Sequence, residues 1–276
     1  MDEKNGAVEA HYTHGGLLDA IRDGLQQAGI GLERVTREDL APLDAFHIRG
    51  LEATRALTAQ AGLTEQMRVL DVGSGLGGSA RYMATEYGCR VDGVDLTREY
   101  CEVAATLSEW LKVERLVTFH HGSALDLPFD AATFDRAWTE HVQMNIADKA
   151  RFYGEIHRVL KPGGRLLFHD VLAGPGGEIY FPAPWAEKPE HNHLITPEAL
   201  RPLLEGLGFE VLHWEDCTQK SLAWFETRME KMKRDGPPPL GSHIIHGDQA
   251  KTRLGNQVRN LAEGRIVLVQ AALEKK

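Results

Sequence analysis

The segment VLDVGSGLGG, residues 69–78, decides the predicted fold of this chain. It begins as an apolar run typical of a buried strand and continues into a glycine-rich turn. A helical pattern follows the turn, because Ala80, Met83, Ala84 and Tyr87 recur at the spacing of one helix face. Strand, glycine turn and helix in this order predict a nucleotide-binding crossover, in which the N–H groups at the start of the helix favour an anionic group.

The glycine turn alone is compatible with two classes of cofactor. Gly73, Gly75 and Gly78 satisfy the G-x-G-x-x-G pattern of dinucleotide-binding proteins, so an NAD-dependent oxidoreductase stays open. Asp71 argues against that class, because a carboxylate at the mouth of the strand suits an ammonium group better than a pyrophosphate. With Gly77 as its third glycine, the segment resembles the first motif, D-x-G-x-G-x-G, of the class I S-adenosylmethionine-dependent methyltransferases.

Further motifs appear in the order typical of the same family. An acidic residue, Asp95, ends a second short strand about 20 residues beyond the turn. The sequence LPF follows at 127–129, and LKPGG follows a helical segment at 160–164. The resemblance spans about residues 44–273 and implies an α/β fold of Rossmann-like type. Its sheet is expected to be doubly wound, seven-stranded and mostly parallel, with an antiparallel last strand.

Residues 1–62 are expected to form a helical N-terminal cap over the cofactor site. Apolar residues at helical spacing predict two helices, of which the second runs from Asp44, its capping residue, to about Ala61. This helix opens on DAFHIRG, which resembles a D-x-F-H-x-x-G stretch that precedes the first strand in bacterial small-molecule methyltransferases. Phe46 and His47 are therefore candidates for ligand contact.

Residues 63–276 form the methyltransferase domain that the resemblance implies. Its strands are predicted at residues 67–72, 90–96, 116–120, 133–138, 165–169, 209–214 and 265–273. Regular periodicity is lost over about residues 171–196, which we interpret as a lid insertion over the acceptor substrate, with a packing arm or a homodimer contact as the alternative. A helical insertion at about residues 218–262 precedes the last strand.

The resemblance implies S-adenosylmethionine as the cofactor, bound at the carboxyl ends of the strands. Asp95 is expected to accept hydrogen bonds from the ribose hydroxyls, and Asp71 to face the ammonium group. Where the family's loop after the third strand often has an Asp that holds the adenine amino group, this chain has Ser123, which can still accept one hydrogen bond. The predicted cofactor-binding residues are Asp71, Gly73, Ser74, Gly75, Gly77, Asp95, Leu96, Ser123, Ala124 and Glu140.

The stretch TEHVQMN at 139–145 follows the fourth strand directly, so it is expected to border the reaction chamber. A hydroxyl acceptor needs a base, whereas a neutral tertiary amine needs none at the moment of attack. His141 is the first candidate for this base, with Glu140 orienting it or the substrate, and His47 is the second. Aromatic rings that attract a cation complete the predicted substrate site, which comprises Tyr12, Phe46, Trp138, His141, Tyr180 and Trp185.

The composition of the chain indicates which kinds of partner, location and metal site to expect. A net charge of −9 without a basic patch disfavours nucleic acid, and no apolar run is long enough to span a membrane. The three cysteines are widely spaced, which fits a reducing cytosol, so a cytoplasmic location is expected. Histidine pairs such as His191 and His193 lack the spacing of a zinc or iron site, so no metal is predicted.

A small-molecule methyl acceptor is the expected substrate. The stretch GGSARYM at 77–83 and the neighbourhood of residues 138–141 resemble N-methyltransferases of sarcosine and dimethylglycine, so the resemblance favours methylation of an amine. The alternative within the family is O- or C-methylation of a phenolic, quinol or natural-product acceptor. Outside the family, the alternatives are an NAD-dependent oxidoreductase and a nucleoside-binding protein without turnover.

Overall fold

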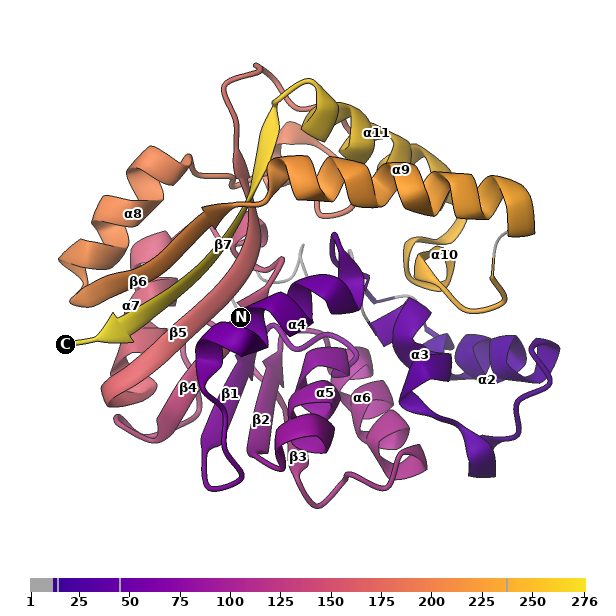
Figure 1. Cartoon of the computed structure of the whole chain (residues 1–276), viewed down its shortest axis with the longest axis horizontal. Helices are drawn as coiled ribbons and strands as arrows, with labels where there is room; N and C mark the ends of the chain where they lie inside the picture. The colour runs from indigo at the N-terminus through magenta and orange to yellow at the C-terminus, as the bar shows by residue number, and fades with distance from the viewer. Residues whose placement is uncertain (1–11, 14, 45, 237) are drawn as a thin grey trace.

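A seven-stranded sheet forms the centre of the computed structural model, which describes residues 12–13, 15–44, 46–236 and 238–276 (Figure 1). The strands are β1 Arg68–Val72, β2 Arg90–Asp95, β3 Val117–His121, β4 Phe134–Glu140, β5 Leu160–Ala173, β6 Phe209–Asp216 and β7 Ile266–Lys275. Their order in the sheet is β3-β2-β1-β4-β5-β7-β6. β7 pairs antiparallel with both β5 and β6, and the other neighbours pair parallel. The predicted doubly wound sheet with an antiparallel last strand is confirmed.

β1 lies between β2 and β4 at the centre of the sheet, so its side chains are covered on both faces. Val69, Leu70 and Val72 are fully buried, which explains why the strand reads as a continuous apolar run. Asp71 interrupts that run and is almost as deeply buried. Because ligands of open α/β sheets bind beyond the carboxyl ends of the strands, the position of Asp71 near the end of β1 places a buried carboxylate at the ligand-binding edge.

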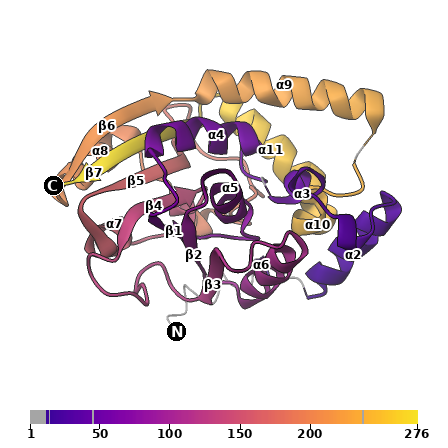
Figure 2. The same ribbon diagram turned by 60° about the horizontal axis from the view of Figure 1, so that its bottom comes forward.

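Helices cover both faces of the sheet. α4 Gly50–Ala61 and α5 Gly78–Tyr87 pack on one face, α7 Lys149–Val159 and α8 Pro197–Gly206 pack on the other, and α6 Arg98–Trp110 packs beside β2 and β3 (Figure 2). Leu57 and Met83 belong to the apolar core on the first face, and Phe152 and Leu200 to the core on the second. Within the described ranges, no helix is long and apolar enough to cross a bilayer.

The cover over the carboxyl edge of the sheet comes from both ends of the chain. The N-terminal region supplies α2 Leu17–Gln27, η1 Leu32–Arg34 and α3 Arg37–Asp44, and the insertion between β6 and β7 supplies α9 Thr218–Asp235, α10 Ser242–His246, η4 Gly247–Gln249 and α11 Ala250–Ala262. Leu25 and Leu43 share one buried cluster with Leu240 and Ile245, so the two segments pack together. Residues 1–11, 14 and 45 of the predicted cap lie outside the described residues.

The predicted helix from Asp44 to Ala61 is wrong in its first part. α3 ends at Asp44, and α4 begins only at Gly50, after a bend in which Arg49 adopts a left-handed backbone with φ 69°. Asp44 does not cap the helix, because its carboxylate forms an ion pair at 2.5 Å with the buried guanidinium of Arg81. Burial raises the pKa of Asp44, and the positive charge of Arg81 opposes that rise.

β5 is longer than predicted, because its carboxyl half continues to pair with β7. Ala173, the last residue of β5, lies opposite Ile266, the first residue of β7. The irregular insertion therefore starts at Gly174, three residues later than the sequence predicts. The remaining 3-10 turns are η2 Gln143–Asn145 and η3 Pro189–His191.

The segment of residues 174–195, which we call the arm, packs against α11 and β7. The ring of Tyr180 lies between two guanidinium groups, with the Cζ atoms of Arg259 and Arg265 at 3.7 and 4.1 Å from the ring centroid. Both arginines also donate hydrogen bonds to the Tyr180 hydroxyl. Cation–π contacts and hydrogen bonds therefore hold this ring to the body of the protein, as a packing arm requires, and the lid over the acceptor substrate stays a prediction.

Candidate active site

A cavity opens at the carboxyl ends of the central strands, beneath the cap. Four segments form its wall: the glycine loop after β1, the end of β2, the loop after β3 and the turn after β4. Its lining residues include Tyr12, Phe46, His47, Asp71, Ser74, Asp95, Leu96, Ser123, Ala124, Glu140, His141 and Asn145. Most of the predicted cofactor residues therefore meet in one place, although they come from four separate parts of the sequence.

Two close approaches shape the glycine loop. Gly73 has a left-handed backbone with φ 73°, and a Cβ atom there would collide with the side chain of Val142. At Gly78, a Cβ atom would lie 2.5 Å from the carbonyl oxygen of Asp44. Only glycine, which has no side chain, lets the loop approach Val142 and Asp44 this closely. Gly77, also a predicted cofactor residue, faces Phe119 and is not one of the residues that line the cavity.

Asp95 is held in a fixed orientation at the end of β2. One carboxylate oxygen accepts a hydrogen bond from Gly75 N and the other from Thr97 N, each at 2.8 Å. Burial raises the pKa of Asp95, and these two N–H groups oppose the rise. Because a carboxylate oxygen has a second lone pair, both oxygens can still accept a hydrogen bond from a ligand in the cavity.

Asp71 and Ser74 offer polar atoms that lack a protein partner. The Oδ2 atom of Asp71 and the Oγ atom of Ser74 are buried, and neither has a hydrogen-bond partner in the described part of the chain. Burial raises the pKa of Asp71 well above its usual value, and the negative charges of Glu140 and Asp95 add to the rise. An ammonium group beside Asp71 would counteract this cost, so the site fits a cofactor that carries both an ammonium group and a ribose.

Glu140, the last residue of β4, gathers several donors on one carboxylate. It accepts hydrogen bonds from Trp138 Nε1 at 2.9 Å and from Thr54 Oγ1 at 3.2 Å, and from the hydroxyl of Ser79. His47 Nε2 lies 3.2 Å from its Oε1 atom. The carboxylate thus connects three elements at the cavity wall: α4 through Thr54, α5 through Ser79, and β4, which carries Glu140 itself.

His141 follows Glu140 in a left-handed backbone with φ 55°, which is uncommon for a residue other than glycine. Its main-chain N–H donates to the carbonyl oxygen of His169 at 3.0 Å. Burial lowers the pKa of His141 well below its usual value, and the neighbouring rings of His169 and His47 lower it further. Its Nε2 atom is buried without a hydrogen-bond partner among the described residues. The carboxylate of Glu140 contacts His47 instead of His141, which corrects the predicted pairing.

His47, the second candidate base, already uses its Nε2 atom. This nitrogen lies 3.0 Å from the carbonyl oxygen of Gly50 and 3.2 Å from Glu140 Oε1. Both partners only accept hydrogen bonds when the carboxylate is ionised, so Nε2 carries a hydrogen in this arrangement. His47 Nε2 is therefore a donor, and it cannot also take a proton from a substrate.

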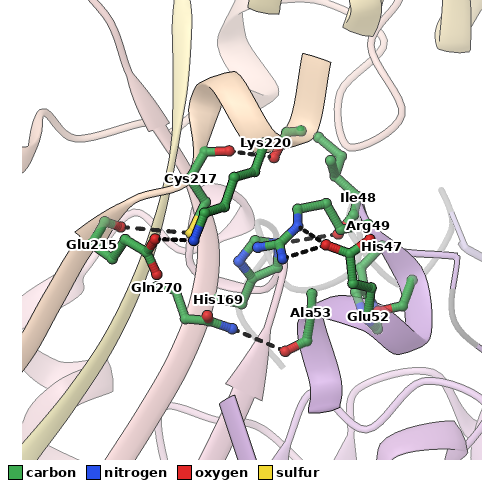
Figure 3. A network of polar contacts seen from close by, with 12 residues as sticks. His47, Ile48, Arg49, Glu52, Ala53, His169, Glu215, Cys217, Lys220 and Gln270 are labelled. Carbon is green, nitrogen blue, oxygen red and sulfur yellow. Dashed lines mark hydrogen bonds and ion pairs between the residues drawn. The ribbon is translucent and has the colours of Figure 1, made fainter. Parts of the chain in front are cut away.

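The bend that carries His47 is fastened to the sheet (Figure 3). His169 Nε2, on β5, donates to the carbonyl oxygen of Ile48 at 3.0 Å, and Gln270 Nε2, on β7, donates to that of Ala53 at 2.9 Å. Burial lowers the pKa of His169 to about 3, so its ring is neutral and serves as a hydrogen-bond donor. Two strands that are distant in sequence thus fix the position of His47 in the cavity wall.

Two of the five predicted aromatic residues line the cavity, namely Tyr12 and Phe46. The structure places the other three elsewhere. Trp138 is fully buried in the core, with its ring nitrogen on Glu140. Trp185 is also buried and donates to Asn192 at 2.9 Å within the arm, where Tyr180 lies as well. These three rings hold the framework together, which corrects their predicted position at the acceptor site.

Sequence reasoning does not identify three polar residues of the cavity wall, namely Ser79, Thr97 and Tyr100. Asn145 does lie in the stretch expected to border the reaction chamber, and its amide nitrogen donates to the hydroxyl of Tyr12 at 3.3 Å. Ser79 follows the glycine turn directly, so its sequence position was a usable signal. Tyr100 reads as an ordinary core residue, because it shares a helix face with apolar residues.

The sheet order, the bare glycine loop and the two buried acids define a class of protein, which comparison with known proteins identifies. A family model described as "Methyltransferase domain" matches residues 70–168. The chain is 32% identical over 229 residues to the sarcosine/dimethylglycine N-methyltransferase of Halorhodospira halochloris, and the match covers 82% of this chain and 78% of that relative. The chain belongs to the S-adenosylmethionine-dependent methyltransferases, and S-adenosylmethionine is its cofactor.

Other relatives act at different atoms. An O-methyltransferase of Aspergillus sclerotiorum, resE, is 29% identical over 216 residues, with 76% of this chain and 77% of the relative covered. A geranyl diphosphate C-methyltransferase from Streptomyces coelicolor, solved with S-adenosyl-L-homocysteine, shares the fold with a TM-score of 0.67 at 19% identity, over 82% of this chain and 79% of that chain. The chain is therefore a small-molecule methyltransferase, and membership of the family removes the NAD-dependent alternative.

Proposed function

We propose that this enzyme methylates the nitrogen of a small amine. The observation that carries the proposal is the charge of the cavity wall, which includes the carboxyl groups of Asp71, Asp95 and Glu140. No Lys or Arg lines the cavity within the described ranges. A wall of this kind attracts the positively charged amino group of an acceptor and disfavours an acceptor whose reacting group is an anion. The similarity to a sarcosine/dimethylglycine N-methyltransferase supports the same reaction.

The cofactor residues divide into three groups in this proposal. Asp71 binds the ammonium group and Asp95 the ribose hydroxyls, because each has acceptor capacity that the protein leaves unused. Ser123, Ala124 and Leu96 line the cavity where the adenine would bind. When bound, S-adenosylmethionine would supply a methyl group on a sulfonium centre: the lone pair of the neutral acceptor nitrogen would attack the methyl carbon as the carbon–sulfur bond breaks, and S-adenosylhomocysteine would leave. An amine that arrives as an ammonium would first lose its proton to solvent.

The acceptor is assigned to the part of the cavity bordered by Tyr12, Phe46, His141 and Asn145. Burial raises the pKa of Tyr12 to about 12, so its hydroxyl keeps its hydrogen at neutral pH and can donate it. This hydroxyl and the amide of Asn145 are hydrogen-bond donors in the part of the cavity assigned to the acceptor, where a carboxylate of sarcosine or dimethylglycine would bind. The rings of Tyr12 and Phe46 add cation–π attraction for the amine.

Methylation of a hydroxyl is the second candidate, and His141 favours it. Its ring is neutral, and its Nε2 atom has no partner among the described residues, so it has the capacity to take a proton from a phenol or alcohol. A neutral tertiary amine needs no base at the moment of attack, because an ammonium can lose its proton to solvent beforehand, whereas a hydroxyl needs one then, so the two candidates differ in their need for this side chain. The amine is preferred because the charge of the whole wall favours it.

The test is a panel of acceptors incubated with the enzyme and S-adenosylmethionine carrying a labelled methyl group. Sarcosine and dimethylglycine represent amines, and a phenol, a quinol and a macrolide sugar represent hydroxyls. Label on the nitrogen of an amine, detected by mass spectrometry, supports the proposal. Transfer to the hydroxyl compounds alone refutes it in favour of the second candidate. Tight cofactor binding without any transfer, measured by calorimetry, refutes both.

A further inference from the structure

The turn after β4, residues 141–146, forms one wall of the acceptor site. Among the described residues, only two main-chain hydrogen bonds lie within it, from Asn145 N to Val142 O and from Ile146 N to Gln143 O, each at 3.0 Å. Its side chains His141, Val142, Asn145 and Ile146 line the cavity. Apart from the short 3-10 turn η2, its main chain is irregular. Buried main-chain polar groups need partners, so groups outside the turn must hold it in place.

A carboxylate holds the start of this turn. Asp170 lies on β5 and is fully buried. It accepts hydrogen bonds from Val142 N at 3.2 Å and Gln143 N at 3.1 Å, and from Val171 N at 2.9 Å. Val142 in turn packs against Gly73, where no side chain fits. This end of the turn is therefore joined to the glycine loop that binds the cofactor.

An ammonium group holds the other end. Lys149, the first residue of α7, is 7% exposed, and its Nζ atom donates to the carbonyl oxygens of Gln143 and Ile146, and to that of His193 at 2.6 Å. An ammonium has three hydrogens, so these three carbonyls use its full capacity. His193 belongs to the arm, and its N–H donates to the carbonyl of Met144 at 3.0 Å. Lys149 thus joins the turn to the arm.

We propose that Lys149 is a positioning residue that sets the affinity for the methyl acceptor. Its ammonium holds the Asn145 end of the turn, whose amide bonds to the Tyr12 hydroxyl in the acceptor part of the cavity. Lys149 itself does not line the cavity, so it acts through Asn145. The inference rests on the proposed acceptor site. It adds that the arm stabilises the turn that borders this site, through the contacts of His193 with Lys149 and Met144.

The two ends of the turn should respond differently to mutation. The Val142 end faces the glycine loop and is held by Asp170, whereas the Asn145 end faces the acceptor and is held by Lys149 through Ile146. Gln143, between the two ends, bonds to both, so Asp170 still holds it when the ammonium is removed. Burial lowers the pKa of Lys149 to about 8, and the charge of Asp170 opposes this fall, so the ammonium form prevails at neutral pH. Removing this ammonium should loosen the acceptor end and leave the cofactor end in place.

The decisive comparison is Lys149→Met with Lys275→Met. Lys275 is a matched control, because its Nζ atom also donates to two carbonyl oxygens, those of His157 and Leu160, each at 2.7 Å, but at the opposite end of α7. We expect Lys149→Met to raise the acceptor KM about tenfold, as expected for the loss of hydrogen bonds from a charged donor. The cofactor Kd from calorimetry should stay within about twofold, and amide exchange in the 142–147 peptide should accelerate. Lys275→Met should change none of the three.

The proposal is overturned if the acceptor KM rises no more in Lys149→Met than in the control, or if the cofactor Kd rises in parallel. Should Lys149→Met fail to fold, Lys149→Gln replaces it, since an amide keeps two N–H donors and loses only the charge and one donor. An unchanged acceptor KM together with unchanged amide exchange in Lys149→Gln also refutes the proposal.

Failure of the amine assignment is a separate outcome. Sarcosine is the first acceptor for the KM measurement, and a wild-type enzyme that methylates no amine removes the proposed function by itself. The KM comparison then uses whichever hydroxyl compound the panel shows to be methylated. Amide exchange uses no acceptor, so it tests the role of Lys149 in holding the turn whatever the substrate.

Discussion

Replacing Asp95 by asparagine tests the cofactor site with little change of shape. Both carboxylate oxygens accept a main-chain hydrogen bond, from Thr97 N and from Gly75 N, each at 2.8 Å, and both have capacity left for the ribose. In Asp95→Asn, one oxygen becomes an NH₂ group that faces an N–H donor. The variant therefore loses one main-chain contact, one ligand contact and the negative charge.

The size of the effect follows from these losses. A hydrogen bond to a charged group contributes about 1.5–3 kcal/mol, so losing one ribose contact should raise the cofactor Kd by a factor of about 10 to 150. Stability should change little. Burial raises the pKa of Asp95, so the folded protein disfavours the ionised form, and a neutral amide avoids that cost. We expect the melting temperature without cofactor to stay within about 4 °C of the wild type.

Calorimetry with S-adenosylmethionine measures the Kd, and Asp92→Asn is the matched control. Asp92 lies on the same strand, but its carboxylate binds Arg68 at 2.8 Å and His120 at 3.0 Å, outside the cavity lining. The assignment of Asp95 is refuted if its variant binds the cofactor as tightly as the wild type. It is also refuted if Asp92→Asn weakens binding equally, since the loss would then reflect a general disturbance of β2.

Three other outcomes follow from the structure. Gly73→Ala should lower both stability and cofactor affinity, because its Cβ atom would displace Val142; unchanged melting and Kd would contradict this. Because the pKa of His141 is lowered, its neutral form persists as the pH falls, so any acid limb of kcat due to His141 should lie below the usual histidine value of 6.5. A midpoint at 6.5 that vanishes in His141→Ala would contradict this. Tyr180→Phe should lower the melting temperature, because Arg259 and Arg265 lose the hydroxyl that accepts their hydrogen bonds. The acceptor KM should not change, and a raised KM would favour the lid interpretation.

The histidines show how tertiary contacts assign roles that residue types leave open. From the sequence, His141 is the first candidate for a base, with Glu140 orienting it or the substrate, and His47 is the second. In the folded chain, His47 Nε2 lies between two acceptor oxygens and is a donor, whereas His141 Nε2 has no partner among the described residues. This difference depends on where α4 and β5 place the partners of each ring, which the residue types alone do not specify.

Local sequence determined the sheet, the glycine loop and the two acids at its mouth, because each depends on short-range patterning. A buried central strand must be apolar, a close turn must lack side chains, and acids at strand ends meet at one edge whatever the rest of the chain does. For the same reason the positions of Asp71 and Asp95 in the cavity were predictable.

Only the tertiary structure decided which side chains complete the site. Trp138 is aromatic and close to the site in sequence, yet the pairing of β4 turns its ring into the core. Lys149 looks like an ordinary helix residue, yet its ammonium meets a carbonyl from the arm, 44 positions further along the chain. Such contacts join segments that are far apart in the sequence, at distances along the chain that follow no regular spacing. Their geometry depends on bends and packing, which short-range sequence patterns do not specify.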